Sequence, residues 1–88
     1  MSSQKQRRVL WQKEYEAAQV VVLERSKGWC EVEGCDHVAE IFHHKKGRRA
    51  KDSNDPTMIL HACNECHLHI HQYPAFSYAN GYMVSRTS

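Results

Sequence analysis

The stretch NDPTMILHACNECHLHIH, residues 54–71, changes its periodicity in the middle. Its first half contains the short apolar run TMIL, residues 57–60, after a turn-forming Asn-Asp-Pro, which is typical of a β-strand. From Cys63 onward the apolar residues follow a helical period. Pro74 predicts a helix end near Tyr73, because proline disfavours helical geometry in the residue before it. The stretch therefore predicts a strand followed at once by a helix.

The four cysteines fall into two closely spaced pairs, Cys30-x4-Cys35 and Cys63-x2-Cys66. Short spacing lets two thiolates bind one ion, so the two pairs together are typical of a tetrahedral zinc site. The alternatives are two disulfides or free buried thiols. Disulfides are typical of secreted proteins, and the N-terminal sequence lacks the apolar core of a secretory signal. Four thiolates leave no open coordination position. We therefore expect a structural zinc ion that joins the loop before the first strand to the start of the last helix.

Three histidines form a second group of candidate metal ligands. In a helix over residues 64–72, His67 and His71 lie four residues apart on one face, while His69 points elsewhere. His43, at the end of an expected strand, is a third candidate, because the cysteine clamp would hold that strand against the helix. Histidine pairs at this spacing also occur on helix surfaces without a ligand. Three imidazoles together would bind a divalent ion and leave positions for water and a phosphate oxygen.

The segment EIFHHKKGRRAK, residues 40–51, joins an expected strand to a basic loop. VAEIFHH, residues 38–44, reads as a strand, and the polar segment 45–56 that follows it predicts a hairpin with a long connection. Five cations of this loop are candidates for binding nucleic-acid phosphates with low sequence preference: Lys45, Lys46, Arg48, Arg49 and Lys51. The alternative is a merely solvated loop. No segment has the spaced Arg, Asn and Gln of a base-reading helix.

The remaining sequence predicts one small domain of 88 residues with a net charge of +2. Residues 5–25 lack Gly and Pro, and Gly28 would end a helix there. The helix carries an apolar stripe through Val9, Leu10, Trp11, Tyr15, Ala18 and Val22. We divide the chain into an N-terminal helix (1–27), the cysteine knuckles with the strands and last long helix (28–73), and a C-terminal turn with a strand-like tail (74–88). No apolar run is long enough to span a membrane, and we expect a cytoplasmic protein.

Together these motifs resemble the HNH endonucleases of the ββα-metal superfamily, in particular small phage-type members with paired cysteine knuckles. The resemblance runs from Trp29 to about Arg86. It is carried by the cysteine pairs, by EIFHHK (40–45), by the stretch 54–71 and by the trailing PAFSYANGYMV (74–84). It implies an α+β fold in which an N-terminal helix precedes a ββα-metal motif stapled by the four-cysteine zinc site.

The same resemblance implies a metal-dependent DNA endonuclease that nicks or cuts both strands. It implies that His44 is the general base and that His43, His67 and His71 bind a catalytic Mg²⁺, Mn²⁺, Ni²⁺ or Zn²⁺ ion. Lys45, Lys46 and a metal cation at His43 would favour the neutral form of His44 by lowering its pKa. By analogy with this phage group, DNA is the substrate, DNA-packaging (terminase) proteins are candidate partners, and the host cytoplasm is the expected location.

One position departs from the HNH pattern. Family members have an asparagine about five residues before the third cysteine that helps to hold the general-base histidine, and here that position is Met58. Asn54 or Asp55 in the preceding loop could supply an equivalent bond. The alternative function is therefore a zinc-stabilised nucleic-acid-binding module with a degenerate HNH site.

Overall fold

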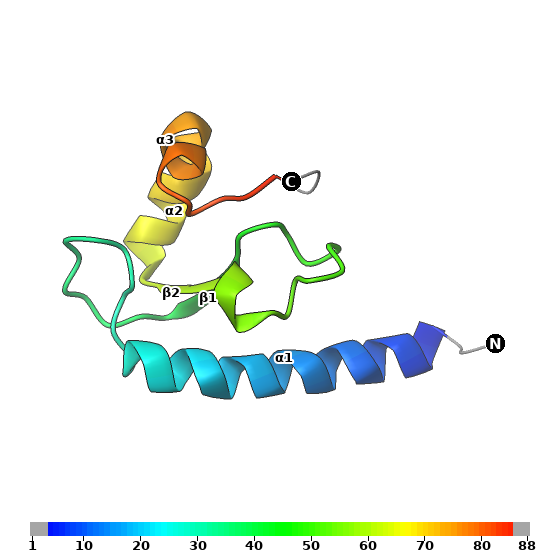
Figure 1. Cartoon of the computed structure of the whole chain (residues 1–88). Coiled ribbons are helices and arrows are strands. Elements are labelled where there is room, and N and C mark those ends of the chain that lie inside the picture. The colour runs from blue at the N-terminus through cyan, green and yellow to red at the C-terminus, as the bar shows by residue number, and fades with distance from the viewer. Residues whose placement is uncertain (1–3, 86–88) are drawn as a thin grey trace.

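A computed structural model describes residues 4–85, in which a short β-hairpin lies between one long helix and two shorter helices (Figure 1). The elements in chain order are α1 (Gln4–Ser26), β1 (Ile41–His44), the 3-10 helix η1 (Pro56–Met58), β2 (Ile59–Ala62), α2 (Asn64–Gln72) and α3 (Pro74–Ala79). The expected α+β class, with an N-terminal helix followed by two antiparallel strands and a helix, is confirmed.

The hairpin pairs β1 with β2 in antiparallel register, from Ile41 opposite Ala62 to His44 opposite Ile59. Both strands are shorter than the sequence predicts. The first begins at Ile41 because Val38 instead forms an isolated bridge with Trp29. The second begins at Ile59 because residues 57 and 58 belong to η1, whose first turn starts at a proline and is capped by a side chain. The hairpin therefore presents only four residues on each strand.

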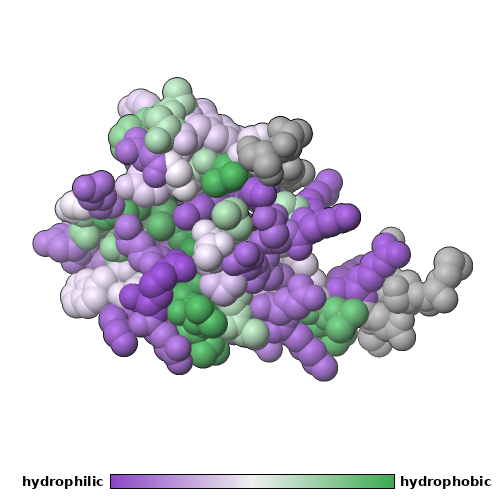
Figure 2. Space-filling view, viewed as in Figure 1, coloured by the Kyte–Doolittle hydropathy of each residue, from purple (hydrophilic) through white to green (hydrophobic). Residues whose placement is uncertain are grey.

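The helix α1 packs on the hairpin through one side of its C-terminal half. Ala18 and Val22 are buried against Ile59, and Tyr15 and Phe42 cover this contact. The expected stripe is wrong at its start, where Val9 and Leu10 are 48% and 59% exposed. At about 100° per residue, Val9 lies on the side of α1 opposite Ala18. In Figure 2, viewed as in Figure 1, apolar spots are visible along the lower edge of a mostly hydrophilic face, where α1 lies.

An arginine near the end of α1 fixes the helix to β2. The Arg25 guanidinium donates to the backbone carbonyls of Pro56 and Ile59 at 2.8 and 2.7 Å and forms an ion pair with Glu31. Glu31 in turn accepts the backbone N–H of His61 at 2.8 Å. These bonds satisfy polar groups at the junction of three segments, so the orientation of α1 on the hairpin does not depend on apolar contact alone.

A second core lies between β2, α2 and the loop that follows α1. Its buried members are Cys30, Leu60, Ala62, Cys63 and Ile70, and Tyr82 and Met83 pack against it. Residues 82–85 form an irregular segment, so the strand-like tail is wrong within the described residues, and residues 86–88 of that prediction lie outside them. No helix in the described part of the chain has the length and hydropathy needed to cross a membrane.

Candidate metal centres

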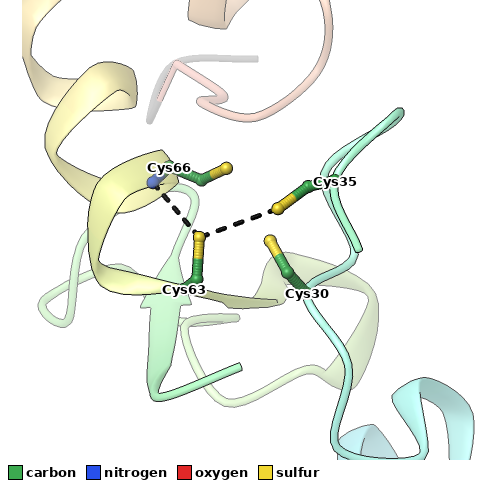
Figure 3. Close-up of side chains that lie close together, drawn as sticks. All are labelled: Cys30, Cys35, Cys63 and Cys66. Carbon is green, nitrogen blue, oxygen red and sulfur yellow. Dashed lines mark hydrogen bonds between the residues drawn. The ribbon is translucent and has the colours of Figure 1, made fainter. Parts of the chain in front are cut away.

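The four cysteines converge from two segments that are far apart in the sequence (Figure 3). Cys30 and Cys35 belong to the loop after α1, which we call the knuckle loop (residues 30–35), and Cys63 and Cys66 belong to the start of α2. All four sulfur atoms lie within 4.8 Å of one another.

The sulfur positions suit a bound ion and not a disulfide. The Sγ atoms of Cys35 and Cys63 are 3.8 Å apart, and all four cysteines are free thiols. A disulfide would bring two sulfurs to about 2.0 Å. Two thiolates on a tetrahedral zinc ion, with bonds of about 2.3 Å, lie about 3.8 Å apart. The donor set and its spacing therefore fit zinc or a similar tetrahedral ion.

The local backbone explains why these thiols meet. Cys63 is the N-cap of α2 and its sulfur accepts the backbone N–H of Cys66 at 3.4 Å, which places both side chains on the first turn. In the knuckle loop a turn closes with the Cys35 N–H donating to the Val32 carbonyl at 3.0 Å. Gly34 within that turn has a φ of 81°, a value that residues with a Cβ rarely adopt.

The thiols cannot all ionise without a cation. Burial raises the pKa of Cys30 and Cys66. Burial also opposes ionisation of Cys63, but hydrogen bonds from the Cys66 N–H and from His37 outweigh it and lower its pKa, and a backbone bond from His37 lowers the pKa of Cys35. Four neighbouring negative charges would repel each other strongly. A divalent ion removes this conflict by binding all four as thiolates.

The three predicted histidine ligands also converge. The His43 side chain lies beside α2, and its ring centroid is 5.3 Å from that of His67 and 5.4 Å from that of His71. One nitrogen of each of the three rings lies within 4.8 Å of the others. The Nε2 atoms of His67 and His71 are 3.1 Å apart, close to the roughly 3.3 Å that two imidazoles on a tetrahedral ion with bonds of 2.0–2.1 Å would have. The remaining helix histidine, His69, contacts Tyr73 and Phe76 instead, as its position on α2 predicts.

The protonation of these histidines suits metal binding. His43 is 4% exposed, and burial lowers its pKa to about 4. Burial and the neighbouring His71 lower the pKa of His67. Both rings are therefore neutral near pH 7, the form that coordinates a metal. His71 is exposed, so the group is open to solvent on one side.

His44 lies outside this group of three and is held by the loop before η1. Its Nε2 atom lies 3.3 Å from Oδ1 of Asn54, and Nδ2 of Asn54 donates to the Trp11 carbonyl at 3.1 Å. Because the amide nitrogen of Asn54 donates to the Trp11 carbonyl, its amide oxygen faces His44 and accepts the Nε2–H of that ring. This leaves Nδ1 of His44 as the proton acceptor. Of the two candidates for replacing the asparagine absent at Met58, Asn54 makes this bond. Asp55 instead caps η1 by accepting from Thr57.

The pKa of His44 is lowered, in the predicted direction but by other groups. Burial is the largest cause, and the charge of Arg48 adds to it, whereas the prediction named Lys45, Lys46 and a metal cation at His43. Lys46 is paired with Asp52 at 3.0 Å, and the partly buried Lys45 has its own pKa lowered by burial. The Arg48 guanidinium lies over Trp11 and Tyr15, 5.9 Å from each ring centroid, and both of these rings lie beside His44.

The five cations of the basic loop therefore differ in their surroundings. Lys46 and Arg48 contact other side chains, Lys45 is partly buried, and Arg49 and Lys51 are exposed. Two hollows flank the histidines beside this loop. One of about 280 Å³ is lined by His43, His44, Gly47, Arg48, His67 and His71 among others. The other, of about 320 Å³, is lined by His43, His44, Lys45, Lys46, His71 and Tyr78 among others.

Sequence reasoning missed two contributors to the site. Trp11 was assigned to the core, but its carbonyl holds Asn54 and its ring centroid lies 6.0 Å from that of His44. Tyr82 received no role, and its carbonyl accepts a bond from Nε2 of His43 at 2.9 Å. Backbone carbonyls have no sequence signature, so neither contact had a signal that could have revealed it.

Comparisons of the chain with family models, curated proteins and solved structures found no match. The functional assignment therefore depends on the residues described above and on their geometry.

Proposed function

We propose that this chain is a metal-dependent DNA endonuclease of the HNH type that hydrolyses phosphodiester bonds with low sequence specificity. One observation carries the proposal: three histidines face one another within metal-ligand distance, while the adjacent His44 is excluded from them and held by a separate bond. Ligands and a nearby unligated base are the parts that hydrolysis of a phosphodiester requires. A role in phage DNA packaging beside terminase proteins, in the host cytoplasm, is part of the same proposal.

The side chains divide the work as follows. His43, His67 and His71 would hold a divalent ion, which supplies positive charge beside the phosphate oxygens and the leaving oxygen. His44 would accept the proton of the attacking water at Nδ1, because its Nε2–H is bonded to Asn54. Its lowered pKa keeps the ring neutral and ready to accept that proton near pH 7. Asn54 would thereby replace the family asparagine, whose position is occupied here by Met58.

The basic loop would position the DNA backbone across the two hollows. Arg48 lines one hollow and Lys45 and Lys46 line the other, and His43, His44 and His71 are common to both. Such contacts go to phosphates and not to base edges, so affinity should fall with salt and depend little on sequence. A strand crossing both hollows would bring one phosphate next to the histidines.

A zinc-stabilised nucleic-acid-binding module is the second candidate. Met58 at the position of the family asparagine favours it, together with a cysteine cluster that needs no catalytic partner to be useful. The two candidates share DNA binding and differ only in cleavage.

Plasmid cleavage separates them. Purified protein is incubated with supercoiled plasmid and Mg²⁺, Mn²⁺, Ni²⁺ or Zn²⁺, alongside His44→Ala and a matched control, His69→Ala, which changes a histidine outside the site. An endonuclease nicks the plasmid, loses at least about 100-fold in rate with His44→Ala while still binding DNA, and is unaffected by His69→Ala. Wild-type protein that binds DNA but leaves it supercoiled with every ion would favour the binding module.

A further inference from the structure

The chain after α3 turns back toward the hairpin and brings a tyrosine backbone to the histidine group (Figure 1). The carbonyl of Tyr82 accepts a hydrogen bond from Nε2–H of His43 at 2.9 Å. The segment itself is fixed on both sides of this contact. The Tyr82 N–H donates to the Ser77 carbonyl at 2.8 Å, and the Val84 N–H donates to the Lys45 carbonyl at 3.0 Å.

The side chain of the same tyrosine reaches the cysteine cluster. Its hydroxyl accepts the backbone N–H of Glu33 at 3.2 Å, and Glu33 lies in the knuckle loop between Cys30 and Cys35. The Tyr82 ring packs against the core that contains Cys30, Cys63 and Ile70. One residue therefore contacts the knuckle loop through its side chain and a histidine of the second group through its backbone.

The bond to the carbonyl decides which nitrogen of His43 is free. A neutral imidazole has one N–H and one lone pair, and a carbonyl can only accept. The proton of His43 is therefore on Nε2, and Nδ1 is the nitrogen with a free lone pair. His67 and His71 differ, because their Nε2 atoms face each other at 3.1 Å. Outer bonds of this kind orient metal-binding histidines and raise their basicity.

We propose that Tyr82 is a positioning residue that makes His43 an Nδ1 ligand and anchors the histidine site to the cysteine knuckle. The inference rests on the metal-binding part of the proposed function and is independent of DNA cleavage. It assigns mixed coordination: Nδ1 from His43 and Nε2 from His67 and His71. It also makes the irregular tail, residues 82–84, part of the site.

Nitrogen-15 NMR of the imidazoles tests the tautomer directly in the wild-type protein with zinc in the cysteine site. At pH 7 we expect the His43 proton on Nε2 and, after a second zinc ion is added, a shift of Nδ1 in His43 and of Nε2 in His67 and His71. A His43 proton on Nδ1, or coordination through its Nε2, would overturn the inference and leave the metal site intact. If added zinc moves none of the three rings, the metal site itself fails, and the tautomer before addition still decides the role of Tyr82.

Two substitutions test the anchor. Tyr82→Ala keeps the backbone carbonyl but removes the ring and the hydroxyl that hold this carbonyl in place. It should therefore weaken binding of the second zinc ion by about 10- to 100-fold in calorimetric titration and reduce the tautomer preference, while the cysteine site keeps its zinc. Tyr82→Phe keeps the ring and the carbonyl and removes only the bond from Glu33, so the loss should not exceed about tenfold. Tyr73→Phe, at an exposed tyrosine, is the matched control and should change nothing. Wild-type affinity in Tyr82→Ala would contradict the proposal. If Tyr82→Ala does not fold, the wild-type spectrum decides: a His43 proton on Nε2 supports the inference, and a proton on Nδ1 overturns it.

Discussion

The cysteine and histidine groups both include neighbouring residues of α2 but differ in how they are enclosed. Cys66 and His67 are adjacent on α2, yet the cysteines face the core of Leu60 and Ile70, whereas the histidines face solvent through the exposed His71. A closed group of four thiolates offers a metal ion no place for a substrate, whereas three imidazoles leave positions open. Burial on one side of α2 therefore suits a structural group, and exposure on the other suits the reactive group that we propose.

The largest expected effect comes from breaking the closed group. Cys66→Ser should release the bound zinc and lower the free energy of unfolding by several kcal/mol, because a small domain depends on such a site for folding. Urea unfolding and metal content per chain measure both. His67→Ala, one residue away, is the matched control and should leave the unfolding free energy within about 1 kcal/mol. A Cys66→Ser protein that keeps its zinc and its stability would remove the distinction between the two groups.

The next effect comes from breaking the open group. His67→Ala should abolish binding of the second, exchangeable ion and reduce plasmid cleavage by more than about 100-fold, since loss of a ligand exceeds loss of an outer contact. The cysteine site should retain its zinc, so the fold survives. Metal analysis after mild chelation provides the measurement. Loss of both ions together in His67→Ala would show that the two groups are one linked site.

Sequence spacing was enough to predict the two groups, because each depends on local geometry. A pair such as Cys63-x2-Cys66 spans one helical turn, and an i, i+4 pair such as His67 and His71 must share a helix face. His43 joined them because the cysteine clamp was expected to hold the strand that ends at His43 and His44 against this helix. The α+β class followed from the same change of period at Cys63.

The contacts that hold these groups could not be predicted, because they join residues that are distant in sequence. Asn54 contacts both His44 and Trp11, which is 43 positions away, and Tyr82 contacts His43 across 39 positions. The pairing of Lys46 with Asp52, which are six positions apart, was missed for another reason: the cations of this loop look alike in the sequence. The start of α1 was predicted to be buried but is exposed. Apolar periodicity indicates which face of a helix is buried, but it does not show how far along the helix the hairpin extends.

A smaller effect should come from removing the bond that holds His44, the proposed general base, while the proposed metal ligands stay in place. Asn54→Ala removes the oxygen that fixes His44 in its Nε2–H form, and plasmid cleavage should fall about tenfold with binding of the second ion unchanged. Asn54→Asp keeps an acceptor for His44 and should recover part of the rate. Equal rates in wild type and Asn54→Ala would remove Asn54 from the site and leave the loss of the family asparagine at Met58 uncompensated.

The smallest expected effect is on the pH dependence of stability, to which the histidine and cysteine groups contribute separately. The pKa of His43 is about 4 in the folded protein, below the ordinary value of 6.5. Between these values the unfolded chain binds a proton that the folded chain does not, so stability is full above about pH 6.5 and decreases as the pH falls toward 4.

The cysteine site also loses stability in acid, since protons compete with zinc for thiolates. His43→Asn removes the first contribution and keeps the second. In urea unfolding at pH 7.5 and pH 5.5, wild type should lose about 1 kcal/mol more than His43→Asn, once screening by solvent at this open site is allowed for. Parallel losses in the two proteins would mean that His43 takes up its proton equally well folded and unfolded, and that the buried ring is no better prepared to bind a metal than a free one.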